Sequence, residues 1–404
     1  MDEELPEWEA PDDDLANAIN EALKGTHLTE AGDITHEVRR IIRTQLYSFD
    51  ADREVAELLR MEEEQPESSL YIQEGLVAFY QGRYERVLVL LTAIERPSAL
   101  VTFLIADAEA SLGDLDTALE DYKNVIAENP RNVDALLSIA CAHYDLDNVE
   151  DQLDFLNRAL ALDESRTIGW RARGFLYLGI GKPDESCADF KRALFLDPED
   201  WESHFGIARG YHLQGDVDNA LKHYNIYLES NPHVAVALYY RACAHFDQDR
   251  MGDALADLDS ALEVSRDDPS ILVKLGEIHH VEGRYKDAAL CYRRAFALAD
   301  DGDKCEILQN LGYVLINDDH PSDAFSIAME ILEMGDTVDG LLLRADARLR
   351  MGDVKGAEND CNLARAGDKD SGAAIYLMQR IMTERGWLRE AKKYEKQLEK
   401  LLAA

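Results

Sequence analysis

The sequence has little positive charge. Only 42 of its 404 residues are Lys or Arg, against 80 Asp and Glu, and the formal net charge is −38. A negative field of this size repels nucleic-acid phosphates and anionic lipid headgroups. Neither nucleic acid nor a membrane surface is therefore expected as a partner of this acidic chain.

Targeting and membrane-spanning segments are also missing. Met1–Leu5 contains neither a basic region nor an apolar run, and no later stretch approaches the roughly 18 apolar residues that span a bilayer. We therefore expect a cytoplasmic protein. The six cysteines include no CxxC pair, so we expect small buried apolar residues in a reducing compartment and no metal site.

Catalytic motifs are absent as well. Gly179–Lys182 resembles part of a phosphate-binding loop, but a Walker motif needs Gly and then Ser or Thr where Leu176 and Pro183 stand. No nucleophile elbow, dinucleotide-binding fingerprint or HExxH motif occurs. We therefore predict that the protein is not an enzyme, with no catalytic residue, no metal and no cofactor.

What the sequence does contain is an internal repeat. Small residues recur at a fixed spacing, and the six from Ala106 to Gly276 are each 34 residues apart. The full set of these anchors is Gly75, Ala106, Ala140, Gly174, Ala208, Ala242, Gly276, Gly312, Ala345 and, weakly, Gln379. A multi-copy period of this length is typical of a repeat architecture.

Each repeat unit is predicted to hold two helices. Two apolar periodic runs are separated by a break such as Gly113-Asp114 or Gly215-Asp216, which ends one helix and begins the next. Pro130, Pro198 and Pro232 close their units, because proline cannot continue the second helix.

One repeat unit carries a sequence signature that is typical of a known repeat family. It has Trp170, Gly174, Tyr177, Gly181, Phe190, Ala193 and Pro198 at matching offsets. Over about residues 66–404 the sequence therefore resembles the tetratricopeptide repeat family. The resemblance implies an all-α fold, a right-handed α-solenoid of about ten helical hairpins, in which the first helix of each pair lines a concave groove. Gln152 and Ser186 depart from the pattern, since Ala usually opens the second helix.

The chain divides into three predicted parts. Residues 1–14 are predicted to be an acidic disordered tail, because prolines and acids in this density cannot nucleate a core. Residues 15–65 are predicted to form capping helices. Residues 66–404 hold the array, with units that start near residues 68, 99, 133, 167, 201, 235, 269, 305, 338 and 372.

The first helix of each unit should present one stripe of side chains to the groove, because other positions pack on the second helix. This stripe is unexpectedly aromatic and carries some cations. The stripe residues predicted to bind a partner are Tyr144, Arg171, Phe175, Phe205, Arg209, His212, Tyr239, Tyr240, Phe246, Lys274 and His280. If these side chains are exposed together, an apolar groove results, and its cations would hold acidic groups of a bound segment. Alternatively, each aromatic packs against a neighbouring helix.

The leading hypothesis is a scaffold or adaptor that binds a peptide or helix of a partner protein in this groove. A second hypothesis is a peptide-sensing regulatory protein whose N-terminal helices act as output, on nucleic acid through Arg39, Arg40 and Arg43. A third is a structural protein that self-assembles by stacking of terminal repeats. Whether the protein forms a homo-oligomer is left open.

Overall fold

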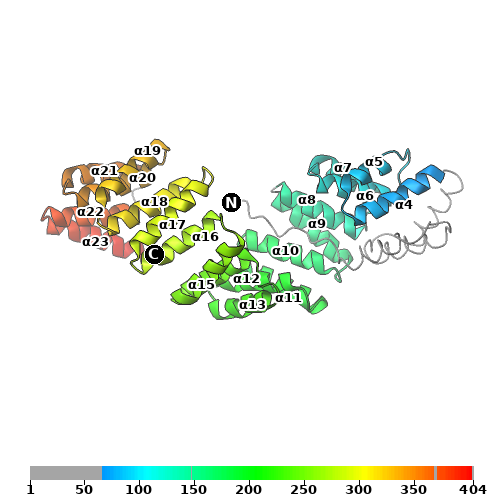
Figure 1. Ribbon diagram of the computed structural model, residues 1–404, viewed down its shortest axis with the longest axis horizontal. Coiled ribbons are helices and arrows are strands. Elements are labelled where there is room, and N and C mark those ends of the chain that lie inside the picture. Colours follow the sequence, from blue (N-terminus) through cyan, green and yellow to red (C-terminus); the bar gives the residue numbers. More distant parts are fainter. Residues whose placement is uncertain (1–65, 147, 368–370, 403–404) are drawn as a thin grey trace. The chain divides into compact units, whose positions relative to one another are not determined.

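The computed structural model describes residues 66–146, 148–367 and 371–402. The predicted acidic tail and capping helices, residues 1–65, lie outside the described residues. The chain divides into two compact units, Met1–Gly210 and Tyr211–Ala404, which we call unit 1 and unit 2. Figure 1 labels the helices of both units, and each unit is described by itself.

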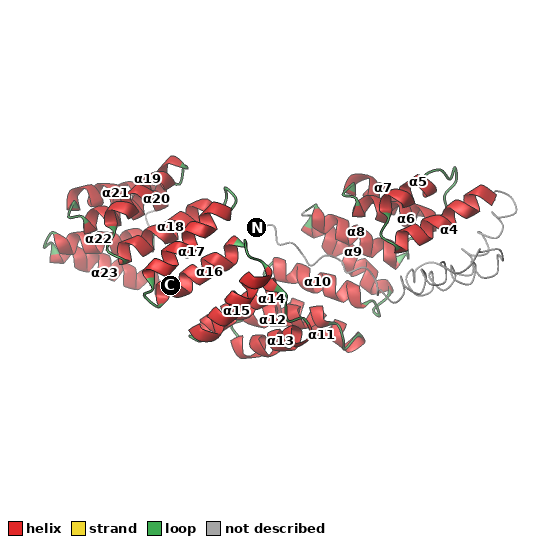
Figure 2. Ribbon diagram, viewed as in Figure 1, coloured by secondary structure: helices red, strands yellow, loops and turns green. Residues whose placement is uncertain are grey.

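The described residues form 20 helices and no strand (Figure 2). The prediction of an all-α solenoid of helical hairpins is therefore confirmed. The helices of unit 1 are α4 (Pro66–Tyr80), α5 (Tyr84–Leu91), α6 (Ala99–Ser111), α7 (Leu115–Glu128), α8 (Val133–Asp145), α9 (Val149–Leu162), α10 (Thr167–Gly179) and α11 (Pro183–Leu196). The helix α12 (Trp201–Leu213) runs from unit 1 into unit 2.

Unit 2 continues the same alternation of a first and a second helix. Its further helices are α13 (Val217–Ser230), α14 (Ala235–Asp247), α15 (Met251–Val264), α16 (Pro269–Val281), α17 (Tyr285–Leu298), α18 (Lys304–Asn317), α19 (Pro321–Glu333), α20 (Thr337–Arg350), α21 (Val354–Gly367), α22 (Gly372–Glu384) and α23 (Leu388–Leu402). Within a unit, each hairpin packs on the next, and first helices such as α14 and α16 also contact one another.

The turn inside a hairpin needs a residue with positive φ. Gly113 has φ +89°, and the following Asp114 caps α7 by accepting a hydrogen bond from the amide of Thr117. Glycine adopts this conformation without the steric cost that a Cβ atom brings. Asp249 and Asp319 take the same place in two other hairpins, with φ of 57° and 59°. Aspartate is among the few other residues that tolerate it.

Small residues let the helices approach closely. The ring of Phe190 in α11 is fully buried between two glycines of neighbouring first helices. A Cβ atom at Gly174 would come within 2.9 Å of this ring, and one at Gly206 within 2.2 Å. In unit 2, Gly276 faces the buried ring of Tyr292 in the same way, at 2.9 Å. Two anchors of the sequence repeat, Gly174 and Gly276, are thus points where bulky rings fill the space between helices.

Three repeats also contain a partly buried ion pair, which we call the Arg–Asp clamp. In each, an arginine of the first helix makes two hydrogen bonds to an aspartate of the second helix, with distances of 2.6–2.9 Å. The pairs are Arg173 with Asp189, Arg241 with Asp257 and Arg344 with Asp360. The hydrogen bonds to Asp189 raise the pKa of Arg173. Paired guanidinium and carboxylate groups of this geometry fix the two helices relative to one another.

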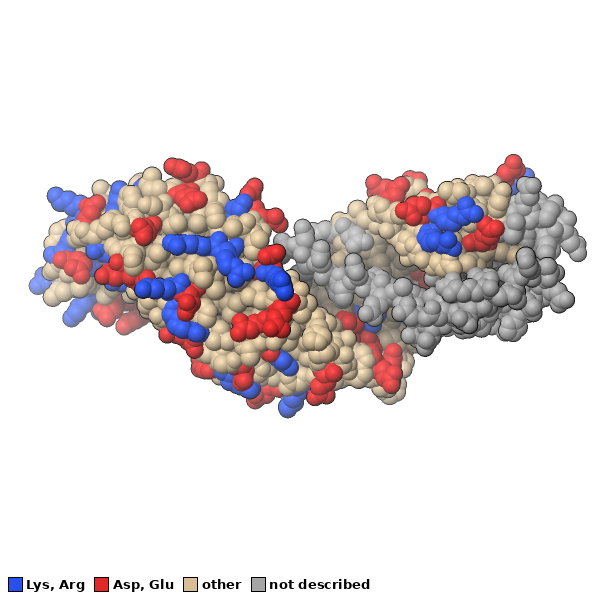
Figure 3. All heavy atoms as spheres, viewed as in Figure 1, with Lys and Arg blue, Asp and Glu red and all other residues tan. Residues whose placement is uncertain are grey.

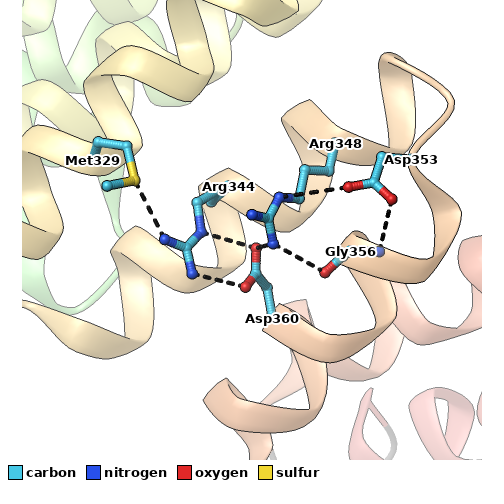
Figure 4. A network of polar contacts seen from close by, with 6 residues as sticks. All are labelled: Met329, Arg344, Arg348, Asp353, Gly356 and Asp360. Carbon is cyan, nitrogen blue, oxygen red and sulfur yellow. Dashed lines mark hydrogen bonds and ion pairs between the residues drawn. The ribbon is translucent and has the colours of Figure 1, made fainter.

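Each clamp also reaches the preceding repeat. Arg173 donates to Asn157 at 2.6 Å, and Arg241 donates to Asn225 at 2.9 Å. In the third clamp, shown in Figure 4, Arg344 reaches Met329, while Arg348 joins Asp360 from the next turn of α20 at 2.7 Å. The clamps therefore link successive hairpins as well as the two helices of one hairpin.

Candidate partner-binding surface

In unit 1, the candidate surface lies on α8, α10 and α12. Tyr144 is 41% exposed at the end of α8. Arg171 in α10 donates to the buried carboxylate of Asp200 at 2.7 Å, and Asp200 also accepts a hydrogen bond from Ser203. The positive charge of Arg171 is thus already compensated within the chain.

The other predicted residues of unit 1 are less exposed than the stripe suggested. Phe175 is half-buried and lies edge-on to Phe190, with ring centroids 4.8 Å apart. Arg209 is half-buried. Phe205 is 7% exposed, so it is a core residue and we remove it from the candidate surface. The prediction for Phe205 was wrong because periodicity gives the direction of a side chain from its own helix and not what neighbouring helices place over it.

Two carboxyl groups of α6 in unit 1, those of Asp107 and Glu109, have raised pKa values. Asp107 in α6 accepts hydrogen bonds from the hydroxyls of Tyr122 in α7 and Ser138 in α8. Burial raises the pKa of Asp107 to about 6, although these two hydrogen bonds act in the opposite direction. Burial likewise raises the pKa of Glu109 to about 7, with Asp121 and Asp114 adding to the effect.

In unit 2, two tyrosines stand side by side on α14. The rings of Tyr239 and Tyr240 are 5.3 Å apart and nearly perpendicular, and both side chains are half-buried. Burial, reinforced by the neighbouring Cys243, raises the pKa of Tyr239 well above its usual range. Tyr239 is therefore neutral at physiological pH, and it can offer a partner both ring surface and a hydroxyl group.

Lys274 in α16 is held inside the surface. Its side chain is 19% exposed, its Nζ donates to Glu277 Oε2 at 2.5 Å and lies 5.1 Å from the ring centroid of Phe246. Burial acts to lower the pKa of Lys274, but Glu277 together with Cys243 and Asp247 raises it overall. The ammonium group is charged and already paired.

Two histidines connect successive first helices of unit 2. His212 at the end of α12 lies 2.8 Å from Asp247 at the end of α14. His280 at the end of α16 lies 2.7 Å from the amide nitrogen of Asn317 in α18, and burial lowers its pKa. The ring of His280 is thus neutral at physiological pH and accepts a hydrogen bond from Asn317. These contacts join helix ends that are 35 and 37 residues apart in the sequence.

The comparisons with known proteins agree with this architecture. The family model described as "Tetratricopeptide repeat" matches residues 103–166, 171–235 and 239–303. These parts of the chain are tetratricopeptide repeats. Its fold is similar to the crystal structure of a tetratricopeptide repeat protein from Parabacteroides merdae, with a TM-score of 0.50 and 18% identity over 62% of this chain and 99% of that one.

Curated relatives match this tetratricopeptide repeat chain at low identity. The Protein CTR9 homolog of Arabidopsis thaliana is 24% identical over 278 residues, which is 65% of this chain and 25% of the plant protein. The DnaJ homolog subfamily C member 3 of Gallus gallus is 22% identical over 276 residues, which is 64% of this chain and 50% of the chicken protein. The chain therefore spans half or less of the length of these two relatives.

The most exposed apolar side chains on the first helices of this tetratricopeptide repeat protein are aliphatic. Leu213 and Val281 are 59% and 60% exposed, and each directly follows one of the two bridging histidines. Val236 in α14 and Ile168 in α10 are also exposed. All four occupy positions of the predicted stripe, but only its aromatic and cationic residues were predicted to bind a partner. The signal that could have found them is the recurrence of aliphatic residues in the first or last turn of these helices.

Charged side chains of both signs occur on the surface of the molecule. On the face shown in Figure 3, Lys and Arg side chains lie among Asp and Glu side chains. Among the described residues, no group of three His, Cys, Asp or Glu side chains could hold a metal ion. No helix in the described part of the chain is long and apolar enough to cross a bilayer.

Proposed function

We propose that the protein is a non-catalytic scaffold or adaptor that binds a peptide or helix of a partner protein on the first-helix face of unit 2. This face is formed by the end of α12 with α14 and α16. The observation that carries the proposal is that Leu213 and Val281 are exposed at the ends of α12 and α16, the first helices that precede and follow α14, which holds the tyrosine pair. Exposed apolar groups near fixed polar groups are typical of protein interaction sites.

The chemistry of the proposed partner follows from the internal pairing of the charges. Arg171 and Lys274 are held by Asp200 and Glu277, so a partner's acidic group would have to compete with carboxylates of this chain. An apolar segment with hydrogen-bonding groups suits the face better. The first-helix face of unit 1, with Tyr144, Arg171, Phe175 and Arg209, is a separate proposal of the same kind. The six free thiols support a reducing, cytoplasmic environment.

The test compares partners that the full chain retains from the native lysate. Leu213→Asp/Val281→Asp places two charges on the proposed face, where burial under a partner would be strongly unfavourable. The matched control is Leu290→Asp/Leu363→Asp, because these two leucines are equally exposed but lie on the second helices α17 and α21. We expect a partner that only the first variant loses, with helix content and stability unchanged in both. Loss of the same partners from both variants, or from neither, would contradict the proposal.

A further inference from the structure

The side of unit 2 formed by the second helices contains a cavity of about 610 Å³. It lies between α13 and α15, with α14 at its base. Its apolar lining includes Leu228, Leu238 and Val264, and its charged lining includes Glu229 and Glu263. The second Arg–Asp clamp, Arg241 with Asp257 and Asn225, forms part of its wall.

The equivalent region of unit 1, 68 residues earlier in the sequence, is filled by the chain itself. There the first clamp, Arg173 with Asp189 and Asn157, is covered by Trp170, whose ring centroid lies 4.9 Å from the guanidinium carbon of Arg173. Arg192 lies over the same indole at 5.9 Å. The indole nitrogen donates to the carbonyl of Glu164 at 2.9 Å. An aromatic ring and a guanidinium group thus occupy the space above this clamp.

Unit 2 lacks both of these groups. Leu238 stands where unit 1 has Trp170, and Ser260 stands where it has Arg192. Each substitution removes several non-hydrogen atoms while the clamp beneath keeps the same hydrogen bonds. The cavity is therefore the volume that the smaller side chains leave open.

The rim of the cavity has also changed its charge. Glu229 and Glu263 replace Ala161 and Phe195 of unit 1. Both glutamates are exposed, and neither has an ion-pair partner among the residues that the structure describes. The clamp aspartate is compensated by Arg241, so the cavity carries two uncompensated negative charges. Such a site favours a cation.

We propose that this cavity binds an aromatic side chain and an adjacent arginine from a partner segment, in the arrangement that Trp170 and Arg192 adopt in unit 1. The ring lies on Leu238 and Val264 above the clamp. The guanidinium group lies between Glu229 and Glu263. None of the residues that line the cavity is among the first-helix residues proposed above to bind a partner, so the two proposals can fail separately.

The test uses the full chain with methyl-labelled leucine and valine, and N-acetyl-Trp-Arg-amide as the probe. We expect saturable shifts of the methyl signals of Leu228, Leu238 and Val264, with a dissociation constant roughly in the millimolar range for so small a ligand. N-acetyl-Trp-Glu-amide should not bind. Absence of saturable shifts, or equal binding of the two probes, would overturn the proposal.

Two variants locate the site. Leu238→Trp/Ser260→Arg transplants the filling of unit 1, and it should abolish the saturable shifts while the chain stays folded. Glu229→Gln/Glu263→Gln should weaken binding about ten-fold, because the charges that attract the probe are removed. The control Glu330→Gln/Glu333→Gln changes two exposed glutamates of α19 and should leave binding unchanged. Retained binding in the filled variant, or equal weakening by the control, would show that the probe binds elsewhere.

Discussion

Removing the acid of the third Arg–Asp clamp should destabilise the repeat formed by α20 and α21. The carboxylate of Asp360 is 3% exposed and accepts three hydrogen bonds, two from Arg344 and one from Arg348, at 2.7–2.9 Å. Asp360→Leu leaves these largely buried guanidinium groups without that carboxylate. Breaking a buried ion pair from one side costs about 3–5 kcal/mol, because the remaining charge is both desolvated and unpaired.

A variant that removes all three charges together separates this effect from loss of packing. Replacing a buried ion pair by apolar groups of similar size is often close to neutral. Arg344→Met/Arg348→Met/Asp360→Leu is therefore expected to lie within about 1 kcal/mol of the wild type. The single variant should be much the less stable of the two, although it differs from the wild type at fewer positions.

Hydrogen exchange is the suitable assay, because repeats can unfold locally and one global transition need not report them. Amides of α20 and α21 should exchange faster in Asp360→Leu, by the factor that corresponds to the lost free energy. Urea unfolding followed by circular dichroism gives an independent value. A loss below about 1 kcal/mol in the single variant would refute the reasoning. So would a triple variant as unstable as the single one.

Three further predictions concern packing, turns and pH. Gly206→Ala should lower the free energy of unfolding in a urea titration by about 1–3 kcal/mol, because its Cβ atom would overlap the ring of Phe190. The control Gly179→Ala has open space around the new Cβ atom, so it should be neutral or slightly stabilising. Asp249→Gly should raise the melting temperature and gain up to about 1 kcal/mol, since at φ of 57° glycine is less strained than aspartate, even though aspartate tolerates this conformation better than most residues. A lower melting temperature would contradict this. Asp107→Asn should stabilise the protein by about 1–2 kcal/mol near pH 7.5 and have little effect near pH 4. Because the pKa of Asp107 is raised from 3.8 to about 6, the protein loses stability as the pH rises through this range, and asparagine does not ionise. An equal gain at both pH values in urea unfolding would rule this out.

The sequence by itself determined the repeating elements. Helix periodicity, a 34-residue spacing and glycines at the turns are local properties, and they depend on backbone sterics and on the burial of one helix face. For this reason the hairpin fold could be predicted, including turns such as Gly113. Asp249 and Asp319 were not predicted as turn residues, because the sequence pattern for the turn inside a hairpin requires glycine.

Only the tertiary structure decided how the polar groups are paired and where space remains. Arg171 and Lys274 had the spacing of exposed cations, but their charges are taken up by Asp200, 29 residues away, and by Glu277. Phe205 shares the register of surface residues, yet it is buried. The cavity above Arg241 depends on which side chains of three helices meet there. Periodicity determines the direction of a side chain from its own helix, whereas its exposure and its partners depend on what the neighbouring helices bring to the same place.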